Sequence, residues 1–203
     1  MSSYSYIGSY SVLGMAYNIK DVFFLSTSAT VTKATSNAGS AQLDLSAYID
    51  PIARGRTKGT GLAVYKVHWS IMSASKSEPM DDAETGVMSY GLQAGVGLGD
   101  LATGSFSLGN TGYSFTNSLL VASGQFYGPK SQIGNACTPV NMIQPGVSPS
   151  TEVPYVIVRD NVCLTYQVAD DFAEDAVLSA RLECAQISLD QATLNQLLRT
   201  QTV

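Results

Sequence analysis

A single histidine is the one imidazole in the chain that could act as a general base or bind a metal. His68 lies in the apolar run 61–73, directly before Trp69, the only tryptophan. Serine and threonine are abundant, so a hydroxyl near His68 would carry little information, and no G-x-S-x-G nucleophile elbow occurs. The residue types therefore favour a structural or surface role for His68 over nucleophilic catalysis.

Carboxylates gather in two short segments, each of which carries four acidic residues. The first group is Glu78, Asp81, Asp82 and Glu84, and the second is Asp170, Asp171, Glu174 and Asp175. Hard cations bind several oxygen ligands, so either segment could supply two or three, although neither matches the EF-hand pattern. The simpler interpretation is a pair of solvated acidic turns.

The second acidic group carries the one site hypothesis that the sequence supports. Basic residues cluster only at Arg54, Arg56 and Lys58, which we predict to be a subunit contact. We expect segment 170–175 to bridge subunits, either through a divalent ion such as Ca²⁺ bound by its four carboxylates or through the basic cluster of a neighbouring copy.

Other patterns predict no enzyme and no resident cofactor. The glycine-rich segment 95–100 lacks the G-x-G-x-x-G spacing, the Walker lysine and the following helix of a phosphate-binding loop. The cysteines Cys137, Cys163 and Cys184 show no CxxC spacing and do not form a disulfide framework. A single histidine also excludes the common zinc ligand sets. We expect Cys163 and Cys184 to pack as small apolar residues, whereas Cys137 lies in a loop.

Composition and charge restrict the partners. The chain has 203 residues and a net charge of −5, and its 13% of charged residues is well below the usual share of about 25%. There is no basic stripe for extensive nucleic-acid binding. We expect no secretion signal at the N-terminus, and no run reaches the length of a membrane helix. A weakly charged surface favours a subunit that contacts copies of itself.

The elements that would position these residues are mostly strands. The run 61–73 is the longest strand signal, with Ala63, Tyr65, Val67, Trp69 and Ile71 on one apolar face and Trp69 as its core anchor. In segment 177–187, Leu178, Ala180, Leu182 and Cys184 alternate with polar residues and should face inward. Further strands are predicted at 21–32, 42–52, 86–96 and 118–127, although periodicity alone does not exclude a short helix at 118–127.

The remaining chain adds loops, one paired region and one helix. Segments 153–158 and 161–168 indicate a hairpin or one bulged strand, and 128–149 indicates a long contact-forming loop. Ser188 and Gln191 fit a capping box for a short C-terminal helix with an apolar stripe at Leu194, Leu197 and Leu198.

About eight strands without a βα alternation or a repeat predict an all-β fold, an antiparallel β-sandwich or jelly roll with a short C-terminal helix. Residues 21–203 should form one domain, and residues 1–20 an uncharged N-terminal arm.

This layout resembles the single jelly-roll capsid proteins of small icosahedral viruses. The likeness is architectural and spans the chain: an uncharged polar arm, short strands with long loops, and a late strand that runs into a capped terminal helix. The resemblance implies a structural protein that assembles into a shell through loop and arm contacts. Its partners would be copies of itself and other virion proteins, and its location the virion, after synthesis in the host cytoplasm.

The chain departs from this family pattern in one respect. Many capsid proteins of this size carry an arginine-rich arm that packages the genome, whereas the first nineteen residues here contain no charged side chain. The resemblance therefore implies that another virion component handles the genome, as in membrane-containing virions, with little direct nucleic-acid binding by this chain.

Three other functions remain open. A carbohydrate-binding or adhesin-like β-sandwich would use its eleven tyrosines to stack on sugars. A β-sandwich glycoside hydrolase would need two facing carboxylates, but the acidic residues lie in predicted loops rather than at inward strand positions. An appendage or surface-layer subunit is disfavoured by the missing export signal.

Overall fold

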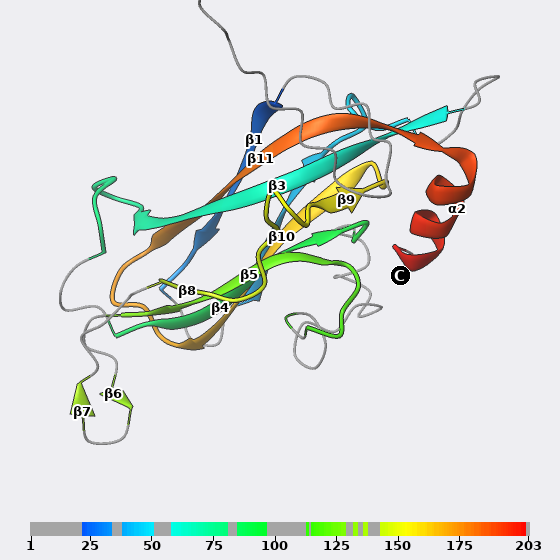
Figure 1. The fold of residues 1–203 in the computed structure, drawn as a ribbon. Coiled ribbons are helices and arrows are strands. Elements are labelled where there is room, and N and C mark those ends of the chain that lie inside the picture. The colour runs from blue at the N-terminus through cyan, green and yellow to red at the C-terminus, as the bar shows by residue number, and fades with distance from the viewer. Residues whose placement is uncertain are drawn as a thin grey trace, which may run out of the picture.

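The computed structural model describes residues 22–33, 38–50, 58–80, 85–96, 113, 115–128, 132–133, 136–137 and 143–201. Two antiparallel sheets pack face to face, and one helix lies at one end of the sandwich (Figure 1). The predicted all-β sandwich with a short C-terminal helix is therefore confirmed. The predicted arm 1–20, Arg54 and Arg56 lie outside the described residues.

The first sheet has four strands in the order β1, β11, β3, β9, and the second has five in the order β2, β10, β4, β5, β8. The four-stranded sheet contains β1 (Val22–Val31), β11 (Ala176–Asp190), β3 (Lys58–Ser73) and β9 (Tyr155–Ile157). The five-stranded sheet contains β2 (Ala38–Asp44), β10 (Asn161–Asp170), β4 (Val87–Ala94), β5 (Leu120–Tyr127) and β8 (Ile143–Pro145). A separate pair consists of β6 (Gln132–Ile133) and β7 (Ala136–Cys137).

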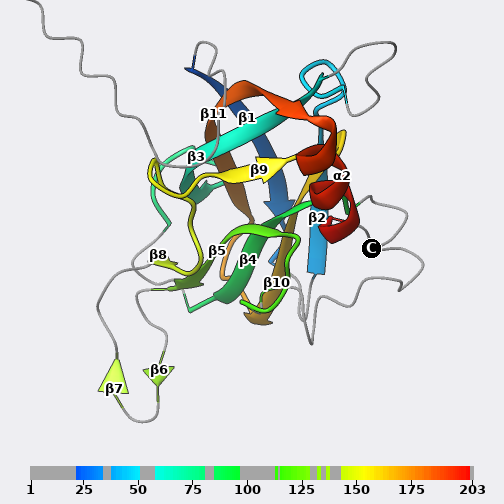
Figure 2. The same ribbon diagram turned by 45° about the vertical axis from the view of Figure 1, so that its right-hand side comes forward.

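Eight of the strands pair in a nested order. With β6, β7 and β8 left aside, the first strand pairs with the last, β2 with β10, β3 with β9, and β4 with β5, all antiparallel. A chain that pairs in this way is one long hairpin rolled into two facing sheets, which is the connectivity of a jelly roll. Figure 2 shows β1, β11, β3 and β9 above β2, β10, β4 and β5.

Inward side chains of both sheets form the main core. On β11, Leu178, Ala180, Leu182 and Cys184 are all buried in it, as the alternation predicts. Their burial removes apolar surface from water, which stabilises the fold by roughly 25 cal/mol per Å².

The prediction for the faces of β3 is wrong at its first half. Adjacent residues of β11 pair with residues two apart in β3, so Tyr65 is an extra residue, a β-bulge. Before the bulge Leu62 and Val64 enter the main core, and after it Val67 does so. Ala63 and Tyr65 instead face the outside of the sandwich and pack in a second apolar cluster.

The helix α2 (Gln191–Thr200) begins later than the capping box predicts. Asp190 is the N-cap, and its carboxylate accepts a hydrogen bond of 2.7 Å from the backbone N–H of Thr193. Ser188 is still part of β11, where it pairs with Thr60. Sheet pairing of β11 therefore continues past the serine, and the helix starts only where the strand ends.

Docking of α2 on the four-stranded sheet covers part of its outer face. Leu194 is fully buried, and Leu197 and Leu198 pack beside it, so the predicted apolar stripe is confirmed. Their partners include Ile187 and Leu189, on the outer side of β11. The second cluster thus fixes the helix at the start of β3 and the end of β11.

Three further expectations are corrected or decided. Segments 153–158 and 161–168 do not form a hairpin, because β9 belongs to one sheet and β10 to the other. The long loop 128–149 contains β6, β7 and β8, of which β8 extends the five-stranded sheet. The ambiguous segment 118–127 contains a strand, β5.

Candidate functional site

The second acidic segment lies at the end of the sandwich where β3 finishes. The backbone N–H of Ala74 donates to the carbonyl of Asp175 at 2.9 Å, and the Ser73 hydroxyl donates to Glu174 Oε2 at 2.8 Å. The carbonyl of Glu78 accepts a bond of 2.9 Å from the N–H of Ser73. The structure thus brings part of the first acidic segment close to the second, which the sequence did not predict.

Several of these carboxylates hold the chain's own loops. Asp175 Oδ1 accepts from the N–H of Lys33 at 2.8 Å, and Asp170 Oδ1 accepts from the N–H of Asp171 at 3.0 Å. Within the described ranges, no group of three His, Cys, Asp or Glu side chains could hold a metal ion. A metal bridge between subunits through this segment remains a prediction. Asp81, Asp82 and Glu84 lie outside the described residues.

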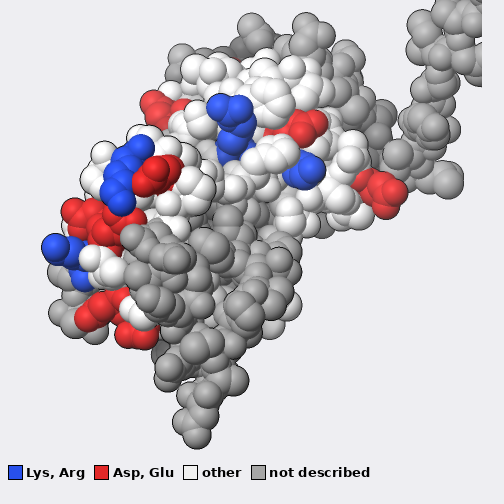
Figure 3. Space-filling model, turned by 90° about the vertical axis from the view of Figure 1, so that its left-hand side faces the viewer, with Lys and Arg blue, Asp and Glu red and all other residues white. Residues whose placement is uncertain are grey.

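The described member of the basic cluster lies at the opposite end of β3. Lys58 is the first residue of this strand of sixteen residues and Ser73 is the last. A strand of that length spans about 50 Å, so Lys58 and the acidic segment of one chain are far apart. Lys58 pairs instead with Asp190 on β11. Figure 3 views the end of the molecule with the acidic segments, where acidic side chains gather with a few basic ones.

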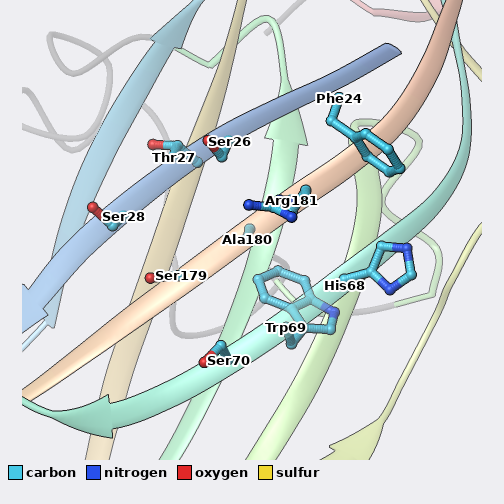
Figure 4. Close-up of a pocket in the computed structure, with 10 residues that line it drawn as sticks. All are labelled: Phe24, Ser26, Thr27, Ser28, His68, Trp69, Ser70, Ser179, Ala180 and Arg181. Carbon is cyan, nitrogen blue, oxygen red and sulfur yellow. The ribbon is translucent and has the colours of Figure 1, made fainter. Parts of the chain in front are cut away.

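The outer face of the four-stranded sheet carries a depression of about 650 Å³ across β1, β11 and β3 (Figure 4). We call it the outer-face depression. It is lined by Phe24, Ser26, Thr27, Ser28, His68, Trp69, Ser70, Ser179, Ala180 and Arg181.

The register of the three strands explains why the surface is hollow there. Ser28, Ser179 and Ser70 stand side by side in one row, and their side chains are short. The next row along contains Arg181 and His68, whose longer side chains form a wall. A row of small residues beside a row of large ones produces a recess on an otherwise flat sheet.

The wall of the outer-face depression mixes charge and aromatic surface. The Arg181 guanidinium lies 5.8 Å from the centre of the Phe24 ring, a cation–π distance. His68 Nε2 lies 3.6 Å from Glu183 Oε2, with 45% and 36% of the two side chains exposed. His68 therefore has a carboxylate neighbour that the sequence did not identify, in an open setting rather than an enclosed catalytic pocket.

Trp69 is partly buried rather than fully inside. Its ring packs edge-on against Tyr90 of the opposite sheet, with ring centres 4.7 Å apart, and it also lines the outer-face depression. The predicted core anchor therefore joins the core to the outer surface. Such edge-to-face pairs stabilise a fold by about 0.5–1.5 kcal/mol beyond their buried area.

The cysteine prediction is confirmed for two positions. Cys163 and Cys184 are buried free thiols, and burial raises the pKa of Cys184 to about 12. A thiol in this setting is protonated and unreactive at neutral pH. Cys137 lies in β7, and its side chain is outside the described part.

The sequence did not indicate one buried polar residue, Gln201, whose side chain holds a strand at the sheet edge. Gln201 is buried although it is polar, and its side chain bonds the backbone of the edge strand β9 and of the residue that follows it. Its amide nitrogen donates to the carbonyl of Val156, and its amide oxygen accepts from the N–H of Val158 at 3.1 Å. No sequence signal marks this residue, because a glutamine at the end of a helix is usually solvated.

Neither a membrane-spanning helix nor a known relative points to a function for this chain. Among the described residues, no helix has the length and apolar character needed to cross a membrane. Comparison of the chain with protein-family models, with curated proteins and with solved structures finds no match.

Proposed function

We propose that this protein is a structural subunit that assembles with copies of itself into a viral capsid shell. The observation that carries the proposal is the nested pairing of eight strands, the connectivity of a single jelly roll. A fold alone does not define a function, so the proposal also depends on the character of the surface.

Surface charge supports contacts between copies. Few side chains are charged, which lowers the desolvation cost of burying a large outer surface. The acidic segment 170–175 and Lys58 mark opposite ends of β3. Contacts between unlike ends are heterologous, and repeated with rotation they close into rings or shells.

The proposal includes where the protein is found and what it binds. Subunits are made in the host cytoplasm and function in the virion, with loops and the N-terminal arm as contact surfaces. Other virion proteins handle the genome, because a net charge of −5 without a basic stripe does not favour direct binding of nucleic acid.

Particle formation tests the proposal. Light scattering after size exclusion is expected to detect capsomers or larger particles, and negative-stain micrographs to show them as closed objects. A monodisperse 21.4 kDa monomer at every salt and calcium concentration would contradict it.

Carbohydrate binding is the second candidate, and the outer-face depression is the observation that favours it. Its serine hydroxyls can exchange hydrogen bonds with sugar hydroxyls, and the exposed Phe24 ring can stack on a sugar face. None of the ten residues that line it is a carboxylate, so the depression does not favour a glycoside hydrolase.

A glycan array separates the second candidate from the first. We expect a binder to lose its signal in a Phe24→Ala variant and in an Arg181→Ala variant, but not in a Lys76→Ala variant. Lys76 is an exposed cation in the loop after β3, outside the depression. Absence of any glycan signal in the wild-type protein would exclude this candidate.

A further inference from the structure

The edge strands of the two sheets differ in how well they are protected against pairing with a further strand. β9 is three residues long, and the Gln201 side chain already bonds its backbone. β8 is also three residues long and ends in Pro145, and β2 has seven residues. β1, at the other edge of the four-stranded sheet, has ten. It is the longest edge strand in the described part of the chain.

β1 also lacks the features that natural proteins use to block edge pairing. The segment 22–31 contains no charged residue, no proline and no glycine. Its ten residues pair with β11 without a register shift, whereas the β3–β11, β4–β10 and β4–β5 pairings each contain one. A long, regular and uncharged edge is a template for another strand.

Two apolar side chains on this strand are exposed. Val22 and Phe24 are 54% and 59% exposed and lie on the outer face of the sheet. They are two of the four large apolar residues exposed in the described ranges. A strand added beside β1 would cover part of both, because residues on neighbouring strands lie about 5 Å apart.

We propose that β1 pairs antiparallel with β1 of a second copy, which joins two four-stranded sheets into one. The inference rests on the proposed self-assembly and names one of its contacts. A second copy fits because the same uncharged edge on both sides gives a two-fold symmetric contact without like-charge repulsion. Both exposed apolar residues then lie inside the contact.

The side-chain period restricts the register of this contact. Residues directly opposite in a sheet face the same side, so outward residues of one copy meet outward residues of the other. The Thr30 carbonyl accepts a 2.8 Å bond from the Tyr166 hydroxyl of the opposite sheet, so we confine the pairing to segment 22–28, whose midpoint is Leu25. Ser26 then lies opposite Phe24 and diagonal to Ser26 of the second copy, about 7 to 8 Å away.

Cysteine cross-linking of the assembled full-length protein tests the contact. A short bis-maleimide that spans about 8 Å should link Ser26→Cys into covalent dimers at least tenfold more than Ser70→Cys. Ser70 is a serine on the same outer face, two strands away from the edge. The wild-type protein measures linking through its own cysteines. Particles or oligomers in which Ser26→Cys links no better than Ser70→Cys would overturn the inference, while self-assembly would still hold.

A charge at the edge provides a second test. Ser28 and Ser70 flank Ser179 in one row, so Ser28→Lys and Ser70→Lys place the same charge at the edge and away from it. Ser28→Lys should lower the oligomer fraction at least tenfold relative to Ser70→Lys, with both variants folded by circular dichroism. Equal assembly of both variants would overturn the edge contact, and a monomeric wild-type protein would overturn the proposed function as well. Linked dimers without particles would support the edge contact and contradict the shell.

Discussion

Tyr90 and Gly124 stand directly opposite each other on β4 and β5, and the tyrosine ring occupies the space above the glycine. A Cβ at Gly124 would lie 2.6 Å from the Tyr90 hydroxyl oxygen, well inside contact distance. Tyr166 covers Gly39 in the same way on β10 and β2. Glycine at these positions is therefore required by a neighbour across the sheet rather than by a turn.

Opposite effects are expected from two changes at the first pair. Gly124→Ala should lower the free energy of unfolding by about 1–3 kcal/mol, because it overpacks the core. Tyr90→Phe should leave it unchanged or raise it, because the buried Tyr90 hydroxyl has no hydrogen-bond partner among the described residues. Urea unfolding measures both. A loss above about 1 kcal/mol in Tyr90→Phe would indicate a partner for the hydroxyl.

The helix cap should make stability depend on pH. Hydrogen bonds from the backbone N–H and the side chain of Thr193 lower the pKa of Asp190 below its usual 3.8, and Lys58 adds to this. Because the folded-state pKa is lowered, the stabilisation is present above pH 3.8 and is lost as pH falls through the folded-state value. The advantage of wild type over Asp190→Asn, measured by urea unfolding, should therefore shrink at low pH. A difference that is constant from pH 7 to pH 2 would contradict this.

At the scale of elements, the Gln201 side chain bonds backbone groups at the β9 edge of the four-stranded sheet, where a further strand would otherwise pair. Its side chain bonds Val156 and Val158, and its backbone carbonyl accepts from Arg159 Nε at 2.7 Å. The end of α2 therefore closes a sheet edge as well as docking through its leucines. This explains why so short a helix is stable at the terminus of the chain.

Gln201→Ala should lower the free energy of unfolding by about 1–3 kcal/mol, since it leaves buried backbone groups unpaired. Amide hydrogen exchange at Val158 should accelerate in the same variant. The control is Gln191→Ala, which removes an exposed side-chain bond of 3.2 Å to Asn195 within the helix. Equal stability of the two variants would show that the edge bonds contribute little.

At the scale of the whole molecule, the jelly roll places Glu78 and segment 170–175 at one end and Lys58 at the other. We predict that segment 170–175 makes a contact between copies, by a divalent ion or by the basic cluster 54–58. Such a contact weakens with salt or with a chelator, because it depends on charge.

The variant Asp171→Asn with Asp175→Asn tests this bridge. Asparagine at position 175 keeps an acceptor oxygen for the N–H of Lys33, so the loop should stay folded while two charges are lost. Assembly measured by light scattering should fall in the variant and, for the wild type, respond to EDTA or salt. Normal assembly of the variant under all of these conditions would refute the bridge.

Much of the strand content could be predicted from the sequence because it depends on local alternation. Segment 177–187 shows this well, since Leu178, Ala180 and Leu182 occupy the core as the pattern indicates. The bulge at Tyr65 could not be predicted, because it exists only relative to the partner strand. The same holds for Ser188, whose capping pattern is overridden by continued sheet pairing.

The sequence by itself determined the all-β class, the terminal helix with its leucine stripe, the buried thiols and the low surface charge. These follow from composition and short-range periodicity. Tertiary structure alone decided the nested pairing, the outer-face depression, the separation of Lys58 from the acidic segments, and the exposed edge of β1. Each of these depends on which distant segments become neighbours, and alternation along one strand does not encode the identity of its partner.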